Sequence, residues 1–216
     1  GAVYANGSHV SEFVGVDRIP LPCPPVICIP TTAGSAADVS QFAIIKNEET
    51  KVKNAIVSKS IVPDVALVDP ETTLTMDRNL TAATGLDALT HNIEAYLARH
   101  YHPICDGIAL EGLRLGAANL ARAVAEPTDL DARGAMLLSS MMGAIAFQKG
   151  LGLVHSCAHA LGTAVDMHHG LANGVMIDHA LAFNVETVPE RFATMAVTVG
   201  LDDTSPSGFL QWLAGL

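Results

Sequence analysis

The spacing of apolar residues changes along this chain. Up to residue 78 the sequence is rich in β-branched residues, Pro and Gly, and its apolar runs are short. "PPVICIP" (24–30) and "PDVALVDP" (63–70) are apolar runs bounded by prolines, which predicts two buried strands. "AIIKN" (43–47) and "VKNAIVS" (52–58) flank a charged turn, so we expect a hairpin there.

From Asn79 onward, Ala, Leu, Met and Gly dominate, and apolar residues recur at helical spacing. Helix-capping residues and prolines separate the periodic segments. The expected helices run from Asn79 or Thr81 to Leu97, from Ile104 to Val124, from Thr128 to Gln148, over 150–162 and over 170–184, with two more starting at Pro189 and within 202–206. The sequence therefore predicts an α/β portion over residues 1–78, followed by an all-α portion over residues 79–216.

Composition narrows the classes of function. The chain has 216 residues, half of them hydrophobic, which is enough to bury a substantial core. Twelve basic against 22 acidic residues, with no Lys/Arg-rich run, argue against nucleic acid and membrane surfaces as partners. No apolar stretch approaches the roughly 20 residues of a membrane span. The cysteines are scattered without a C-x-x-C pair, so we expect a reducing compartment, the cytoplasm.

Two pairs of polar residues stand out on apolar, helix-forming segments. Asp87 and His91 in "TGLDALTHNIEAY", and His155 and His159 in "HSCAH", each lie four positions apart, so each pair shares one helix face. A single pair can be a surface contact or a satisfied core histidine. As a set, one carboxylate and several imidazoles have the chemistry of a Zn²⁺ or Fe²⁺ site. Spacing alone leaves open which histidines join Asp87.

The segment "IPTTAGSAADVS" (29–40) is a second candidate site. Its hydroxyls, backbone N–H groups and Gly34 would follow a strand, and ligands of α/β sheets bind at the carboxyl ends of strands. The alternative is an ordinary Gly/Ser/Thr loop. No complete G-x-G-x-x-G or Walker A motif follows any expected strand.

Five stretches occur in an order that resembles the iron-dependent (group III) alcohol dehydrogenases. They are "PTTAGSAADVS", "VDPETT", "TAATGLDALTHNIEAY", "GLVHSCAHALG" and "HHGLANGVMI". The resemblance is closest to the branch of short-chain alcohol, lactaldehyde and propanediol dehydrogenases. It implies a dehydroquinate synthase-like architecture, in which 1–78 is part of the dinucleotide-binding α/β domain and 79–216 is the helical metal-binding catalytic domain.

The resemblance also implies roles for individual residues. The family's metal ligands match Asp87, His91, His155 and His169. His159 matches a residue close to the nicotinamide and the substrate, and His168 stands where many members carry Pro, so we expect it not to bind the metal. The loop that contacts the dinucleotide matches Thr31, Thr32 and Ser35, with Lys53 as a further candidate. The family usually has Glu where this chain has Asp38.

The function implied by the resemblance is hydride transfer between a small alcohol or aldehyde and NAD or NADP, with the substrate oxygen on Fe²⁺ or Zn²⁺, in a homo-oligomer such as a dimer. A related glycerol dehydrogenase, a dehydroquinate synthase-like enzyme and a non-catalytic helical module with a structural metal are the alternatives. The family's Gly-Gly-Gly-Ser phosphate-binding turn has no counterpart in the sequence, so we expect an internal portion of a longer protein, whose ability to bind NAD by itself is open.

Overall fold

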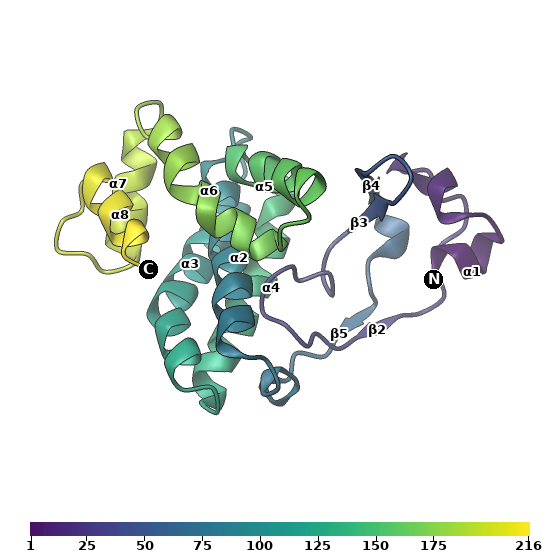
Figure 1. Cartoon of the computed structure of the whole chain (residues 1–216), viewed down its shortest axis with the longest axis horizontal. Coiled ribbons are helices and arrows are strands. Elements are labelled where there is room, and N and C mark those ends of the chain that lie inside the picture. The colour runs from purple at the N-terminus through teal and green to yellow at the C-terminus, as the bar shows by residue number, and fades with distance from the viewer.

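The computed structural model describes residues 1–216 and is mostly helical with few strands (Figure 1). The long helices gather in one body, and most of the chain before residue 78 extends from one side of it. The helices of this body are α2 (Arg78–Leu97), α3 (Pro103–Ala125), α4 (Leu130–Ala146), α5 (Leu153–Ala164), α6 (His169–Asn184), α7 (Pro189–Thr198) and α8 (Pro206–Ala214). A short helix, α1 (Ala2–Asn6), lies at the far end of the extension.

The extension contains two small sheets. The strands are β1 (Gly15–Val16), β2 (Ile27–Cys28), β3 (Phe42–Asn47), β4 (Val52–Val57) and β5 (Val65–Ala66). β3 and β4 are antiparallel, so the predicted hairpin is confirmed, and β1 pairs with β4 in parallel. The chain also contains four short 3-10 helices: η1 (Val10–Phe13), η2 (Lys59–Ile61), η3 (Pro70–Thr73) and η4 (Phe147–Lys149).

The strands predicted at 24–30 and 63–70 exist as β2 and β5, which pair in parallel. The expectation that they are buried is wrong: Ile27 is 68% exposed and Leu67 54% exposed. Each of the two strands has only the other as its sheet neighbour, and the helical body lies beyond their end rather than over their faces. Their apolar side chains are therefore left uncovered.

The first long helix starts earlier than its sequence suggests. The Asp77 side chain accepts a hydrogen bond from the Leu80 amide at 2.8 Å and caps α2. The expected caps Asn79 and Thr81 are therefore wrong, and Thr81 lies within the helix, where its hydroxyl donates to the Asp77 carbonyl at 2.8 Å. Asp77 has the extended backbone of an N-cap, and its carboxylate satisfies one of the first free amides of the helix.

The other helix boundaries follow local signals more closely. Asp129 rather than the expected Thr128 caps α4, by accepting from the Ala132 amide at 2.9 Å. The predicted starts at Pro189 and near residue 206 are confirmed by α7 and α8. Pro suits the first helical turn, because the N–H that it lacks has no partner there.

α2 runs through the centre of the helical body (Figure 1), and from Asp87 to Tyr96 its side chains are buried on every face. Leu89 and Ile93 are fully buried, as is the polar Asn92. The NH₂ group of the Asn92 side chain donates to the carbonyls of Ala88 and Ser139 at 2.8 and 2.9 Å, so both of its donors have buried acceptors. The same requirement applies to every other polar side chain of α2.

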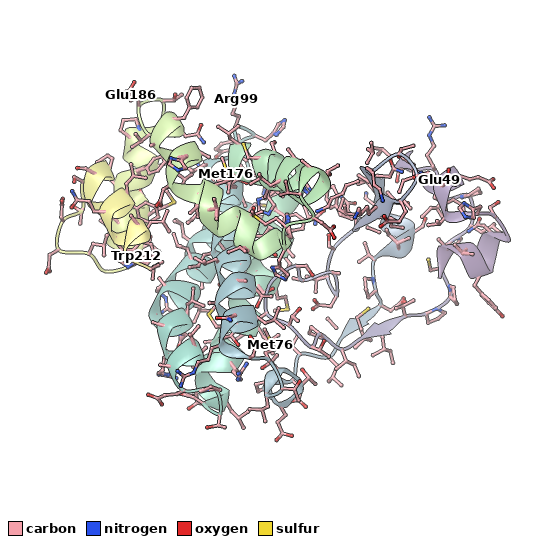
Figure 2. All side chains as sticks on the ribbon, viewed as in Figure 1. Glu49, Met76, Arg99, Met176, Glu186 and Trp212 are labelled. Carbon is pink, nitrogen blue, oxygen red and sulfur yellow. The ribbon has the colours of Figure 1, made fainter.

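Aromatic side chains pack together in α7 and α8, at the end of the molecule away from the two sheets. Phe209 of α8 packs edge-on against Phe192 of α7, with ring centroids 6.0 Å apart, and against Trp212 at 5.3 Å. Trp212 lies on one side of the view in Figure 2, and Glu49, at the tip of the hairpin, lies on the opposite side.

No single helix is both long enough and apolar enough to span a membrane. One pair of segments, Leu130–Lys149 and Leu153–Ala164, reaches that length and apolar composition only when taken together, and the two segments are bent by 104° relative to each other.

Candidate functional site

Asp87 and His91, the two polar residues predicted to share one face of α2, lie beside each other in the structure. Asp87 and His91 are both 4% exposed and lie one helical turn apart. The Nε2 atom of His91 is 3.7 Å from Oδ1 of Asp87. Because α2 is buried all round, both groups sit in an interior where each needs a partner.

Two further helices bring their histidines to the same oxygen. His155 on α5 and His169 at the start of α6 each place Nε2 3.6 Å from Oδ1 of Asp87. The rings of His91 and His155 stack with centroids 4.5 Å apart, and those of His155 and His169 lie 5.4 Å apart. The structure therefore brings together all four residues predicted as metal ligands.

The spacing of these atoms fits a metal ion better than direct hydrogen bonds. Separations of 3.6–3.7 Å are beyond the usual hydrogen-bond distance of about 3 Å. Four ligands about 2.1 Å from a tetrahedral metal ion would stand about 3.4 Å apart. The donor atoms of Asp87, His91 and His155 lie within 4.8 Å of one another, and His169 adds a fourth donor from the more exposed side.

The charges of the site suit a divalent cation once His155 has lost a proton. Burial opposes the charge of Asp87, but the imidazoles of His91, His155 and His169 outweigh it and hold the pKa of Asp87 well below its ordinary value. Burial lowers the pKa of both His91 and His169 to about 4, so both rings are neutral at neutral pH. His155 is protonated at neutral pH, because its pKa is raised to about 9. A metal ion on Nε2 would displace that proton, and the site would then consist of three neutral imidazoles and two carboxylates, those of Asp87 and Glu94. Such a group balances two positive charges.

Glu94, one turn beyond His91 on α2, is a site residue that the sequence analysis missed. It is 2% exposed, and its Oε2 accepts a hydrogen bond from Nδ1 of His155 at 2.7 Å. Burial disfavours the charge of His155, but its contacts with Asp87 and Glu94 outweigh burial and raise the pKa of His155 to about 9. The signal in the sequence was an acid three positions after His91 on the same apolar helix.

Asn173 on α6 was also missed. It is fully buried, and its amide donates to Oδ1 of Asp87 at 2.7 Å. The same nitrogen lies 3.4 Å from Nε2 of His155. Asn173 thus holds the carboxylate of Asp87 in place from the interior side of the group.

His159 and Lys53, predicted as a catalytic and a cofactor-binding residue, line one cavity of about 580 Å³. The hairpin β3–β4 forms one wall of this cavity and α5 the other. The lining residues are Ile44, Val52, Lys53, Ala55, His159, Ala160, Thr163 and Ala164. On its other side, the ring of His159 is 5.0 Å from that of His169, so His159 stands between the cavity and the histidine cluster.

The backbone of the loop with Thr31, Thr32 and Ser35 is held against α4 and α2. Ser140 on α4 donates to the carbonyl of Gly34 at 2.8 Å, and both groups are buried. A Cβ atom at Gly34 would lie 2.9 Å from Cβ of Thr84, so only glycine permits this approach to α2. Thr31 and Ser35 are exposed, and Thr32 is half-buried. The predicted non-ligand His168 is exposed at the start of α6.

Both portions of the chain are similar to known protein families. Residues 81–210 match the family described as "Fe-containing alcohol dehydrogenase family, C-terminal", and residues 1–70 match "Iron-containing alcohol dehydrogenase". Together these two matches span nearly the whole chain.

Individual relatives are longer than this chain. It is 40% identical to the NAD-dependent methanol dehydrogenase of Bacillus methanolicus, over 93% of this chain and 53% of that protein. It is 41% identical to the 1,3-propanediol dehydrogenase of Klebsiella pneumoniae, over 96% of this chain and 54% of that protein. The crystal structure of a 1,3-propanediol oxidoreductase superposes with a TM-score of 0.94 at 36% identity, covering 100% of this chain and 58% of the other. The chain therefore spans about half the length of the curated relatives that it matches.

Proposed function

Because the chain belongs to the iron-containing alcohol dehydrogenase family, we propose that it forms the metal-binding part of an NAD-dependent alcohol dehydrogenase. The observation that carries the proposal is the convergence of three imidazole Nε2 atoms on one oxygen of Asp87, at 3.6–3.7 Å. His91, His155 and His169 would hold a divalent cation together with Asp87. Fe²⁺ is the metal that the family name supports, and Zn²⁺ suits the same ligands.

When bound, the cation would supply a Lewis acid for the substrate oxygen, and the dinucleotide would supply the hydride chemistry. The chain's own residues would orient the substrate and move its proton. His159 stands between the cluster and the cavity, and burial together with the charges of His155 and Lys53 lowers its pKa. A neutral imidazole at this place can accept the hydroxyl proton of an alcohol.

The cavity between the hairpin and α5 would receive the reacting ends of both molecules. The ammonium of Lys53 would attract the dinucleotide, whose phosphates are negative. Thr31, Thr32 and Ser35 would contact the dinucleotide from their loop. The names of the relatives, methanol and 1,3-propanediol dehydrogenase, support a small alcohol or aldehyde as substrate, and the first of them supports NAD rather than NADP.

The wider organisation belongs to the same proposal. Residues 1–78 would be part of a dinucleotide-binding domain and residues 79–216 the helical catalytic domain, with the active site between them. A cytoplasmic homo-oligomer is the proposed form of the whole protein.

A structural metal site is the competing function for the same cluster. A structural site is closed to solvent ligands, whereas a catalytic site keeps an open position. The side chain of His169 is 29% exposed, against 4–6% for the other three ligands, so the cluster opens on the side next to His159. This asymmetry favours the catalytic function.

The experiment is to incubate the purified protein with NAD⁺ and a panel of short alcohols, and to follow the nicotinamide absorbance before and after metal removal by a chelator. Turnover that disappears on chelation and returns with Fe²⁺ or Zn²⁺ is the expected result. Turnover confined to glycerol, or a lyase reaction without net hydride transfer, would assign the protein to one of the related enzymes. A bound metal without turnover of any alcohol would support the structural site.

A further inference from the structure

Glu94 caps a helix to which it does not belong. The residue before α5, Gly152, offers no side chain to the first amides of that helix. The carboxylate of Glu94, from the last turn of α2, takes this place: Oε1 accepts from the amide of Val154 at 2.7 Å, and Oε2 accepts from the amide of His155 at 3.2 Å. A carboxylate at a helix N-terminus is favoured by the free N–H groups and by the helix dipole.

The same carboxylate determines the state of the His155 ring. Nδ1 of His155 donates to Oε2 of Glu94 at 2.7 Å, and Nε2 points to Asp87. A neutral imidazole carries one proton, so a proton held on Nδ1 leaves the lone pair on Nε2, the atom that faces the cluster. A partner of this kind orients metal-binding histidines and strengthens them as ligands.

We propose that Glu94 is a positioning residue that fixes both the start of α5 and the tautomer of His155, so that Nε2 is ready to bind a divalent cation. This inference rests on the proposed function, in which His155 is a metal ligand. It requires a group that only accepts hydrogen bonds, because three N–H donors converge on the two oxygens of Glu94.

Glutamine is therefore not equivalent at this position, although it has the same shape. If its NH₂ group replaced Oε2, it would face Nδ1 of His155, and the ring would have to move its proton to Nε2 to accept the new bond. If the NH₂ group replaced Oε1, it would leave the buried Val154 amide without an acceptor. In the first case His155 loses its free Nε2, and in the second the start of α5 is displaced.

Gly152 offers a way to move the carboxylate without removing its charge. A Cβ atom at Gly152 would lie 2.7 Å from Oε1 of Glu94, which is too close for both to keep their places. The φ of Gly152 is −130°, so this position does not need the left-handed backbone that favours glycine. Gly152→Ala should displace the carboxylate while leaving the net charge of the site unchanged.

The test is a titration of the chelator-treated protein with Co²⁺, whose ligand-field absorption reports both affinity and coordination. Wild type, Glu94→Gln and Gly152→Ala are compared with Glu111→Gln, an exposed control whose carboxylate pairs with Arg114 at the surface. We expect Glu94→Gln to bind Co²⁺ about 10- to 100-fold more weakly and with a changed spectrum, at wild-type helix content. Gly152→Ala should shift the spectrum in the same direction, and Glu111→Gln should match wild type.

Wild-type affinity and spectrum in a folded Glu94→Gln protein would overturn the proposal and leave Glu94 as a helix cap alone. If Glu94→Gln does not fold, Gly152→Ala decides: an unchanged spectrum and affinity would overturn the proposal in the same way. Failure of the wild-type protein to bind Co²⁺ at all is a different result. It would overturn the proposed function, and this inference with it.

Discussion

Lys53 on β4 and His159 on α5 face each other across one cavity, although they are far apart in the sequence. The ammonium of Lys53 lies against α5 at Gly162, where a Cβ atom would come within 2.5 Å of it. The hairpin is thus held close enough to α5 for a cation and an imidazole to share the space beside the histidine cluster. The first two predictions concern these two side chains.

His159→Ala should leave the metal content unchanged and reduce the turnover of alcohols by about 10²- to 10⁴-fold, since the proton acceptor is lost. Protonated His159 cannot accept the hydroxyl proton, so wild-type oxidation should fall as the pH drops through the pKa of His159. Burial and the charges of His155 and Lys53 place that pKa below the ordinary value of about 6.5. The measurement is the pH dependence of kcat, with His179→Ala on the exposed face of α6 as control. Loss of metal from His159→Ala would show that the roles of His155 and His159 are exchanged.

Lys53→Ala should raise KM for NAD⁺ about tenfold, since one charge contact with the dinucleotide is lost, while the metal content stays the same. Lys51→Ala is the matched control on the same hairpin. The ammonium of Lys51 is exposed and pairs with Glu48 at 2.9 Å, outside the cavity. Steady-state kinetics with varied NAD⁺ measure both variants. Equal KM values for the two would remove Lys53 from the dinucleotide site.

Ser140→Ala should also raise KM for NAD⁺, through the loop that Ser140 holds. It leaves the buried Gly34 carbonyl without its partner, at a cost of about 1–3 kcal/mol, and frees the segment with Thr31 and Ser35. Ser139→Ala is the control, since its neighbouring hydroxyl donates to the Gly112 carbonyl at 2.7 Å and has no contact with the loop. Both variants should melt at a lower temperature, but only Ser140→Ala should change KM. A normal KM in Ser140→Ala would show that the loop keeps its position without this bond.

His169→Ala should remove one of the four donors to the metal, and the protein should retain far less metal after dialysis. His168→Ala changes the adjacent histidine, which is exposed at the N-cap of α6. It should keep the wild-type metal content. Elemental analysis of the two dialysed variants is the measurement, and equal metal contents would exclude His169 from the site.

Local features of the sequence predicted much of the fold. The hairpin at 43–58 and the helix starts at Pro189 and near 206 depend on turn and capping residues next to the element itself. The start of α2 was misplaced because Asp77 is as good a cap as the two residues considered, and only the backbone conformation decides between them. The burial of β2 and β5 was wrong because a strand's exposure depends on what covers it, which the strand does not encode.

The candidate site was predictable only in part. The spacing of Asp87 and His91 places both on one helix face, but nothing local identifies His155 and His169 as the histidines that reach the same oxygen. The family resemblance supplied that set. Glu94 was missed because two of its three partners are backbone amides on another helix, and amides carry no residue type for a motif to show.

The central claim is that Asp87, His91, His155 and His169 hold one metal ion, and anomalous X-ray scattering tests it most directly. Crystals of the protein grown with Fe²⁺ or Zn²⁺ should give a single strong peak at the absorption edge of that metal. The account predicts this peak at about 2.0–2.2 Å from Oδ1 of Asp87 and from the three Nε2 atoms. A peak elsewhere, or ordered side chains without a peak between them, would contradict it.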